Sequence, residues 1–108
     1  MDGGIPVFDG EGYEIWSKKM KTLFVSQELW DLVQQGYKGF GENSKLGLRE
    51  CRKKDAKALY FIQQGVSHSI FPIIMEAKRS KEAWDAIRNK FHLEVIVKIQ
   101  FIMDHSNG

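Results

Sequence analysis

The chain has 108 residues, 43% of them hydrophobic, which suits one small domain with a single modest core. Its 16 lysines and arginines nearly balance its 14 aspartates and glutamates, so net charge alone does not imply nucleic-acid binding. The single cysteine excludes an intramolecular disulfide and a zinc site built from several cysteines. Because the N-terminus is not basic and then apolar, and no apolar run reaches about 18 residues, we expect an intracellular, cytoplasmic protein without a membrane partner.

Two amphipathic helices are predicted in the first third of the chain. Over about 12–26, apolar residues recur three or four positions apart, the period of one helical face. They are Tyr13, Trp16, Met20, Leu23 and Phe24, with Lys18, Lys19 and Lys21 on the opposite side. A shorter helix is predicted at about 28–35, ending at Gly36, because glycine readily adopts a left-handed cap. Three glycines in six positions then predict a loop over 36–44.

The longest predicted helix covers about 45–66 and has two chemically different halves. The first half is basic, and its cations are Lys45, Arg49, Arg52, Lys53, Lys54 and Lys57, against only Glu50 and Asp55. The second half is apolar, so the helix is expected to enter the core as it proceeds while its basic half projects into solvent. The basic half has two interpretations, a contact with RNA phosphates or an ordinary solvated face. We favour the solvated face, because the basic stretch itself holds no aromatic residue that could stack on unpaired bases.

The last third is expected to complete an all-α fold. Pro72, which lacks a backbone N–H, predicts a short helix at about 70–77 with the proline in its first turn. Ser80 is a predicted N-cap whose hydroxyl accepts from backbone amides of a helix at about 81–91, with Glu82 in its first turn. The tail after His92 fits a helix at about 93–103 or an alternating strand; we choose the helix because no partner strand is evident. The prediction is an all-α small bundle of five or six helices.

No recognisable catalytic, cofactor-binding or metal-binding motif is present. The spacings between Cys51 and the histidines, His68, His92 and His105, fit neither a known cysteine–histidine nucleophile pattern nor a compact zinc site. We therefore expect no enzyme activity, no cofactor, no metal and no small-molecule substrate. A hydrolase built on Cys51 would require a histidine within hydrogen-bond reach of its sulfur.

The large apolar residues at helical spacing are interpreted as anchors of the core, in preference to platforms for a ligand. These predicted anchors are Tyr13, Trp16, Met20, Trp30, Pro72, Trp84 and Phe91.

Four segments in register resemble the Gag-type N-terminal region of plant copia-class retrotransposon polyproteins. They are Phe8-x-Gly10-x-x-Tyr13-x-x-Trp16-x-x-x-Met20, Leu29-Trp30-x-x-Val33-x-x-Gly36, Ile70-x-Pro72-x-Ile74 and Lys81-Glu82-Ala83-Trp84-Asp85-x-Ile87-x-x-x-Phe91, which together span roughly residues 7–92. The resemblance implies a helical, capsid-like domain with a structural, self-associating role in particles built around element RNA. Full-length family members usually continue through further helices to a zinc knuckle. We therefore expect a single Gag-like domain over 1–108, truncated at its C-terminal end, with a weakened role in RNA packaging.

Self-association is the expected partner interaction. If the helices that usually follow cover the face made by Ile96, Phe101 and Ile102, that face is here exposed or paired with a second copy, which predicts a homo-oligomer. The alternative function is a small helical adaptor or nucleic-acid-binding module that uses the basic 45–57 segment, with RNA as a weaker candidate partner.

Overall fold

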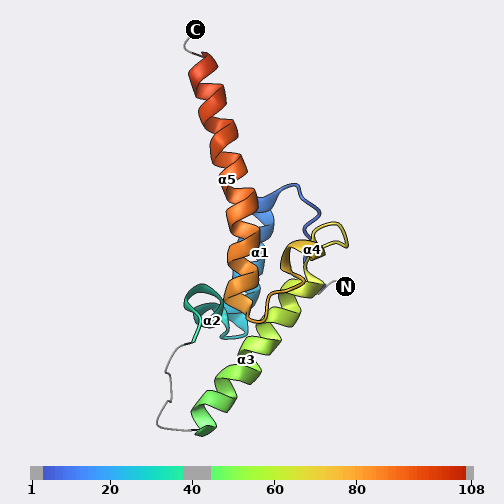
Figure 1. Cartoon of the computed structure of the whole chain (residues 1–108), viewed down its shortest axis with the longest axis vertical. Helices are drawn as coiled ribbons and strands as arrows, with labels where there is room; N and C mark the ends of the chain where they lie inside the picture. The colour runs from blue at the N-terminus through green and yellow to red at the C-terminus, as the bar shows by residue number, and fades with distance from the viewer. Residues whose placement is uncertain (1–3, 38–44, 107–108) are drawn as a thin grey trace.

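The computed structural model describes residues 4–37 and 45–106, without the side chains of 45, 46, 93–98, 105 and 106. In these ranges the chain forms five helices, which are α1 (Tyr13–Ser26), α2 (Trp30–Gln35), α3 (Lys45–Gln64), α4 (Phe71–Ile74) and α5 (Ser80–Ser106) (Figure 1). The β pairing within them is one isolated parallel bridge between Phe8 and Val66. The all-α prediction is confirmed. The predicted loop at 36–44 lies, after Tyr37, outside the described residues.

The last helix differs from its prediction in length. The expected helices at about 81–91 and 93–103 are one continuous helix of 27 residues, and the strand alternative for the tail is wrong. α3 and α4 are also shorter than predicted. α3 ends at Gln64 because the Ser67 N–H donates to the carbonyl of Phe8 at 2.9 Å, which draws this stretch into the bridge. α4 occupies only the middle of the predicted 70–77 helix.

The turn between α1 and α2 explains why α2 begins later than predicted. Glu28 has φ +59°, and it is the one residue with positive φ in the described ranges that is not glycine. Its N–H donates to the carbonyl of Val25 at 3.1 Å, and the N–H of Leu29 donates to that of Phe24 at 2.7 Å. This is the Schellman pattern, which ends a helix with one left-handed residue. Leu29 thereby becomes the N-cap of α2, which starts at Trp30.

The core is an aromatic stack between α1 and α5. The rings of Trp16 and Trp84 are stacked with centroids 5.6 Å apart, and Phe8 stacks on the other side of Trp16 at 5.1 Å. Trp30 meets Trp84 edge to face at 5.7 Å. Such pairs add about 0.5–1.5 kcal/mol each beyond the burial of their area. The N-terminal segment is fixed on this stack, because the Trp16 Nε1–H donates to the Pro6 carbonyl at 3.2 Å.

The predicted anchors divide into three groups by burial. Tyr13, Trp16, Met20 and Trp84 are buried in the core, and Trp30 and Phe91 are half-buried and packed against it. Pro72 is exposed, which corrects its placement in the core. It lies in the first turn of α4, where its ring faces solvent and its missing N–H has no helical partner to lose. The buried residues of that run are Ile70 and Ile74.

The start of α5 is capped by another helix. The Ser80 hydroxyl donates to Oδ1 of Asp55 at 2.6 Å, and the Ser80 N–H lies 3.3 Å from the same oxygen. Both residues are buried, with Asp55 4% and Ser80 0% exposed. α5 begins at Ser80 itself, so Ser80 is the first residue of the helix, which corrects its prediction as the N-cap. A carboxylate from α3 receives these donors and lies where the positive end of the α5 dipole favours an anion.

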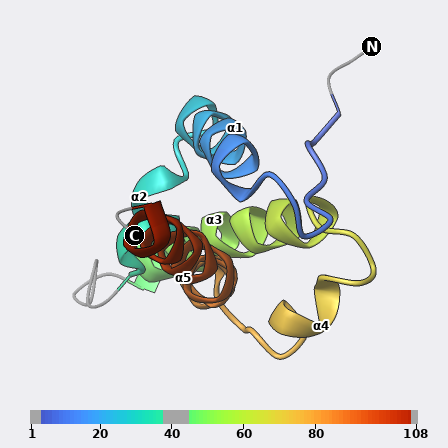
Figure 2. The same ribbon diagram turned by 90° about the horizontal axis from the view of Figure 1, so that it is seen from above.

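α5 gives the molecule its elongated shape. The body packs around its first half, while its second half extends past the other helices and ends far from them (Figure 1); Figure 2 shows this half nearly end-on. The principal extents are 61 × 35 × 25 Å, and the radius of gyration is 16.3 Å. A compact chain of this length has a radius of gyration of about 13 Å.

Candidate functional site

The basic half of α3 forms an exposed face directed away from the core. Arg49 and Lys53 occupy the side of the helix opposite the buried Asp55, Ala58 and Ile62, with Arg52 and Lys57 flanking them, and all four are exposed. Lys54 is exposed closer to the edge of this face, and the side chain of Lys45 is not described. Because Asp55 turns inward to Ser80, Glu50 is the one acidic residue of α3 that remains exposed beside the cations. We call Arg49, Arg52, Lys53 and Lys57 the α3 basic face.

Tyr60 extends this face with an exposed aromatic ring that the sequence interpretation missed. It is 55% exposed and lies three residues after Lys57 and seven after Lys53, so all three share one side of the helix. Its ring centroid is 6.4 Å from that of Phe61. Helical spacing from the basic residues was the signal that could have identified it, because Tyr60 lies just beyond the stretch defined by charge.

Cys51 does not form a catalytic pair with a described histidine. It is partly buried on α3, and no described hydrogen bond joins its sulfur to His68 or His92. The His92 ring contacts Glu14 instead, with Nδ1 3.2 Å from Oε2. Among the described residues, no cluster of three histidine, cysteine, aspartate or glutamate side chains could hold a metal ion. In the same part of the chain, no helix combines the length and apolar character needed to cross a membrane.

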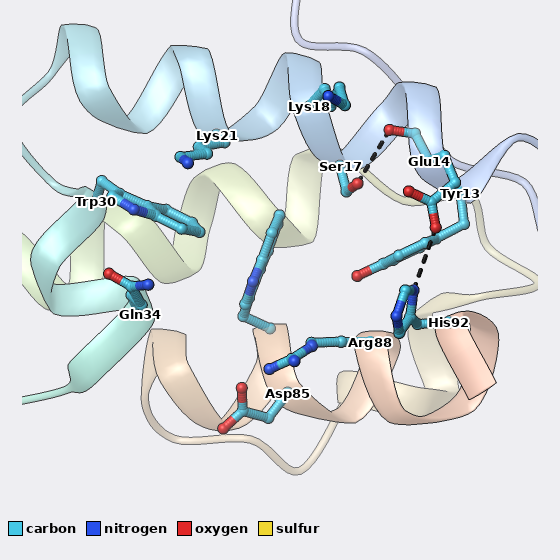
Figure 3. A pocket seen from close by; sticks show the side chains of 11 residues that line it. Tyr13, Glu14, Ser17, Lys18, Lys21, Trp30, Gln34, Asp85, Arg88 and His92 are labelled. Carbon is cyan, nitrogen blue, oxygen red and sulfur yellow. Dashed lines mark hydrogen bonds and ion pairs between the residues drawn. The ribbon is translucent and has the colours of Figure 1, made fainter. Parts of the chain in front are cut away.

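A cleft of about 330 Å³ separates α1 from α5 and is closed at one end by α2 (Figure 3). Its aromatic floor consists of Tyr13, Trp30 and Trp84, which also belong to the core stack or pack against it. Its walls carry charged and polar side chains, namely Glu14, Ser17, Lys18 and Lys21 from α1, Gln34 from α2, and Asp85, Arg88 and His92 from α5. The sequence interpretation did not identify this cleft.

The pKa of Tyr13, in the lining of this cleft, is shifted by burial and by nearby charges. Burial raises the pKa of the Tyr13 phenol above its usual value of 10.0, the nearby Arg88 partly opposes the rise, and Glu14 and Asp85 add to it. Asp85 is paired with Lys81 one turn earlier on α5, Nζ to Oδ2 at 2.5 Å. The Lys21 ammonium lies 5.2 Å from the Trp30 ring centroid, a cation–π distance.

The projecting half of α5 carries an exposed apolar surface. Ile99, Phe101, Ile102 and Met103 are between 52% and 64% exposed. At 100° per residue, Ile99, Ile102 and Met103 share one side of the helix and Phe101 lies on the opposite side. The side chain of Ile96, the third member of the predicted face, is not among those described. We call Ile99, Ile102 and Met103 the α5 apolar stripe.

Comparison with known families gives a match over most of the chain. The model of the gag-polypeptide of LTR copia-type matches residues 20–103. This match ends later than the motif resemblance over roughly 7–92, so it also covers the α5 apolar stripe. The α3 basic face lies within both ranges. No curated protein and no solved structure matches the chain significantly.

Proposed function

Because the chain belongs to the gag-polypeptide family of LTR copia-type, we propose that it is a non-enzymatic structural domain that self-associates in capsid-like assembly. The observation that carries the proposal is the α5 apolar stripe, whose three side chains are between 52% and 64% exposed. We assign a second copy of the same chain as its partner.

The stripe continues a face of α5 that the body already uses for packing. Ile102 follows Trp84 by 18 residues, which is five full turns, so the two side chains leave the helix on the same side. Near Trp84 this side meets α1 and α2. Among the described side chains of α5, Phe91 meets Phe8 and His92 meets Glu14 from the N-terminal part of the chain. Farther along the helix, Ile99 and Ile102 on the same side are 52% and 64% exposed, as is expected of a helix that packs on a partner.

The size of the stripe predicts weak association. Full burial of an aliphatic side chain contributes about 1.5–3 kcal/mol, so covering the exposed part of each stripe residue gives about 1 kcal/mol. Three residues on each of two chains give about 6 kcal/mol, while the loss of translational and rotational freedom costs about 4–15 kcal/mol. At the low end of this cost about 2 kcal/mol remains, which corresponds to a Kd of roughly 30 mM, so the isolated chain should form only a small fraction of dimers near 1 mM. Such weak contacts become effective when many copies assemble together.

Sedimentation velocity from about 1 μM to about 1 mM tests this function. We expect the weight-average sedimentation coefficient to rise with concentration, and Ile102→Glu to abolish the rise. Ile15→Glu is the matched control, because Ile15 is 66% exposed on α1, away from the stripe. A wild-type chain that stays monomeric throughout, or an equal effect of the two substitutions, would contradict the proposal.

A second candidate function is RNA binding at the α3 basic face. Tyr60 beside these cations favours it, because exposed aromatic rings stack on unpaired bases and each such contact contributes about 1–3 kcal/mol. The four cations predict a slope of about −3 for log K against log salt on single strands, or about −0.7 for each phosphate contact.

Electrophoretic or anisotropy titrations at several salt concentrations test the RNA proposal. We expect Arg52→Gln and Lys53→Gln each to reduce the salt slope by about 0.7, and Tyr60→Ala to weaken binding with the slope unchanged. Lys90→Gln, an exposed lysine on α5, should change neither quantity. Binding that is absent, or that is unaffected by the α3 substitutions, would exclude this function.

A further inference from the structure

The cleft between α1 and α5 has features of a binding site that neither self-association nor the α3 basic face uses. Both of its carboxylates have a partner within the chain, since Glu14 contacts His92 and Asp85 contacts Lys81. The cations of its lining have no such carboxylate partner among the described contacts. Lys18 and Lys21 approach it from α1 and Arg88 from α5, so positive charge lines both walls (Figure 3).

The balance of charge in the lining favours an anion. With His92 neutral, three cations and two carboxylates give a formal charge of +1, and the two carboxylates are already engaged. Lysine and arginine donate several hydrogen bonds to phosphate oxygens, and arginine can do so with two parallel N–H groups. A phosphate between Lys21 and Arg88 would occupy the mouth of the cleft without displacing Glu14 from His92 or Asp85 from Lys81.

The floor of the cleft favours a flat apolar group beside that anion. Trp30 and Trp84 meet edge to face at 5.7 Å; Trp30 is half-buried and supplies most of the open aromatic surface, since Trp84 and Tyr13 are only 7% and 8% exposed at the bottom of the hollow. Pockets for small ligands begin at about 300 Å³ and combine apolar walls with a few placed polar groups. At about 330 Å³, this hollow has room for one aromatic base with its sugar and phosphate, and for little more.

We propose that the cleft binds a single nucleoside monophosphate group, with its base against the Trp30–Trp84 floor and its phosphate held by Lys18, Lys21 and Arg88. This group can be a free nucleotide or the phosphorylated end of a nucleic-acid strand, because both present the same chemistry. Binding at one such shallow site should be weak, in the range of about 0.1–1 mM.

The three tryptophans provide a readout with an internal control. In a two-dimensional ¹H–¹⁵N spectrum the indole groups of Trp16, Trp30 and Trp84 give separate signals. We expect adenosine monophosphate to shift the Trp30 and Trp84 signals in a saturable manner. The position of the Trp16 signal should not change, because Trp16 does not line the cleft and its indole N–H donates to the Pro6 carbonyl. Adenosine and inorganic phosphate should each bind more weakly than the monophosphate.

Charge variants identify the residues that hold the phosphate. We expect Lys21→Gln and Arg88→Gln each to weaken adenosine monophosphate binding about three- to fivefold, the usual effect of one exposed charge pair. Lys19→Gln is the matched control, since this exposed lysine of α1 does not line the cleft. Glu14→Gln should strengthen binding, because it removes a carboxylate from the lining.

Three results would overturn the proposal. They are no shift of Trp30 and Trp84 at millimolar nucleotide, equal binding of adenosine and its monophosphate, and equal effects of Lys19→Gln and Lys21→Gln. Short oligonucleotides with and without a 5′-phosphate then distinguish the two sources. A phosphorylated strand that binds more tightly than the free nucleotide assigns the cleft to strand ends, and the reverse order assigns it to free nucleotides. If the α3 basic face does not bind RNA, the Trp30 and Trp84 signals should still shift with nucleotide. The proposal for the cleft and the proposal for RNA binding can therefore be refuted independently.

Discussion

The buried carboxylate of Asp55 is expected to be a principal determinant of the fold's stability. Asp55→Ala would leave the Ser80 N–H and hydroxyl buried without an acceptor, and each unsatisfied group costs about 1–3 kcal/mol. It would also remove an anion from the N-terminus of α5, which contributes about 0.3–1 kcal/mol, or up to about 2 where partly buried. Because the Ser80 hydroxyl can rotate toward another acceptor, its cost is reduced. We expect the free energy of unfolding to fall by about 2–4 kcal/mol in total.

This loss is large for a domain of 108 residues, whose free energy of unfolding is expected to be about 5–15 kcal/mol. With an unfolding entropy of about 2.1 cal/mol/K per residue, it corresponds to a Tm lower by about 10–20 °C. Circular dichroism during heating and urea titration would measure it. Glu50→Ala is the matched control, because Glu50 is an exposed acid on the same helix. If Asp55→Ala and Glu50→Ala both changed stability by less than about 0.5 kcal/mol, the argument from the cap would be refuted.

Two further substitutions test local features of the fold. Glu28→Gly should raise the free energy of unfolding by about 1 kcal/mol in urea titration, because glycine adopts the φ of +59° at the end of α1 without steric cost; a loss of stability would contradict the Schellman assignment. Tyr13→Phe should flatten the decline of stability at alkaline pH. Since the pKa of Tyr13 is raised in the folded state, its contribution is complete below the unfolded value near 10 and is lost as pH rises from there through the folded pKa. Urea titrations of wild type and variant between about pH 8 and 11 would show the difference, and parallel curves would refute it.

Periodicity was sufficient to predict the helices whose buried face is continuous. In α1, Tyr13, Trp16, Met20 and Phe24 are buried at the spacing from which the helix was predicted. The tail of α5 was ambiguous because its apolar residues fit both periods, and β-branched residues favour strands. We predicted a helix because no partner strand is evident in the sequence, and the structure confirms the helix.

The features that sequence reasoning missed depend on residues that meet only in the folded chain. Asp55 and Ser80 are 25 positions apart, so Ser80 resembled a self-sufficient N-cap until the position of α3 supplied the carboxylate. The cleft combines residues from α1, α2 and α5, and no local pattern identifies such a set. Tyr60 was different, because its spacing from Lys53 and Lys57 was visible in the sequence.

The central claim, that the α5 ends of two copies pack together, can be tested most directly by pulsed dipolar spectroscopy. Spin labels would be placed by Gln100→Cys on α5 and, in a separate sample, by Gln34→Cys on α2, each in a Cys51→Ser background. Gln100 lies in the projecting half of α5, whereas α2 packs beside the start of that helix (Figure 1). The account predicts a short, well-defined distance between chains for the label at 100, and no comparable distance for the label at 34. A short distance for the label at 34 alone, or none for either label at the concentration where the chain dimerises, would contradict it.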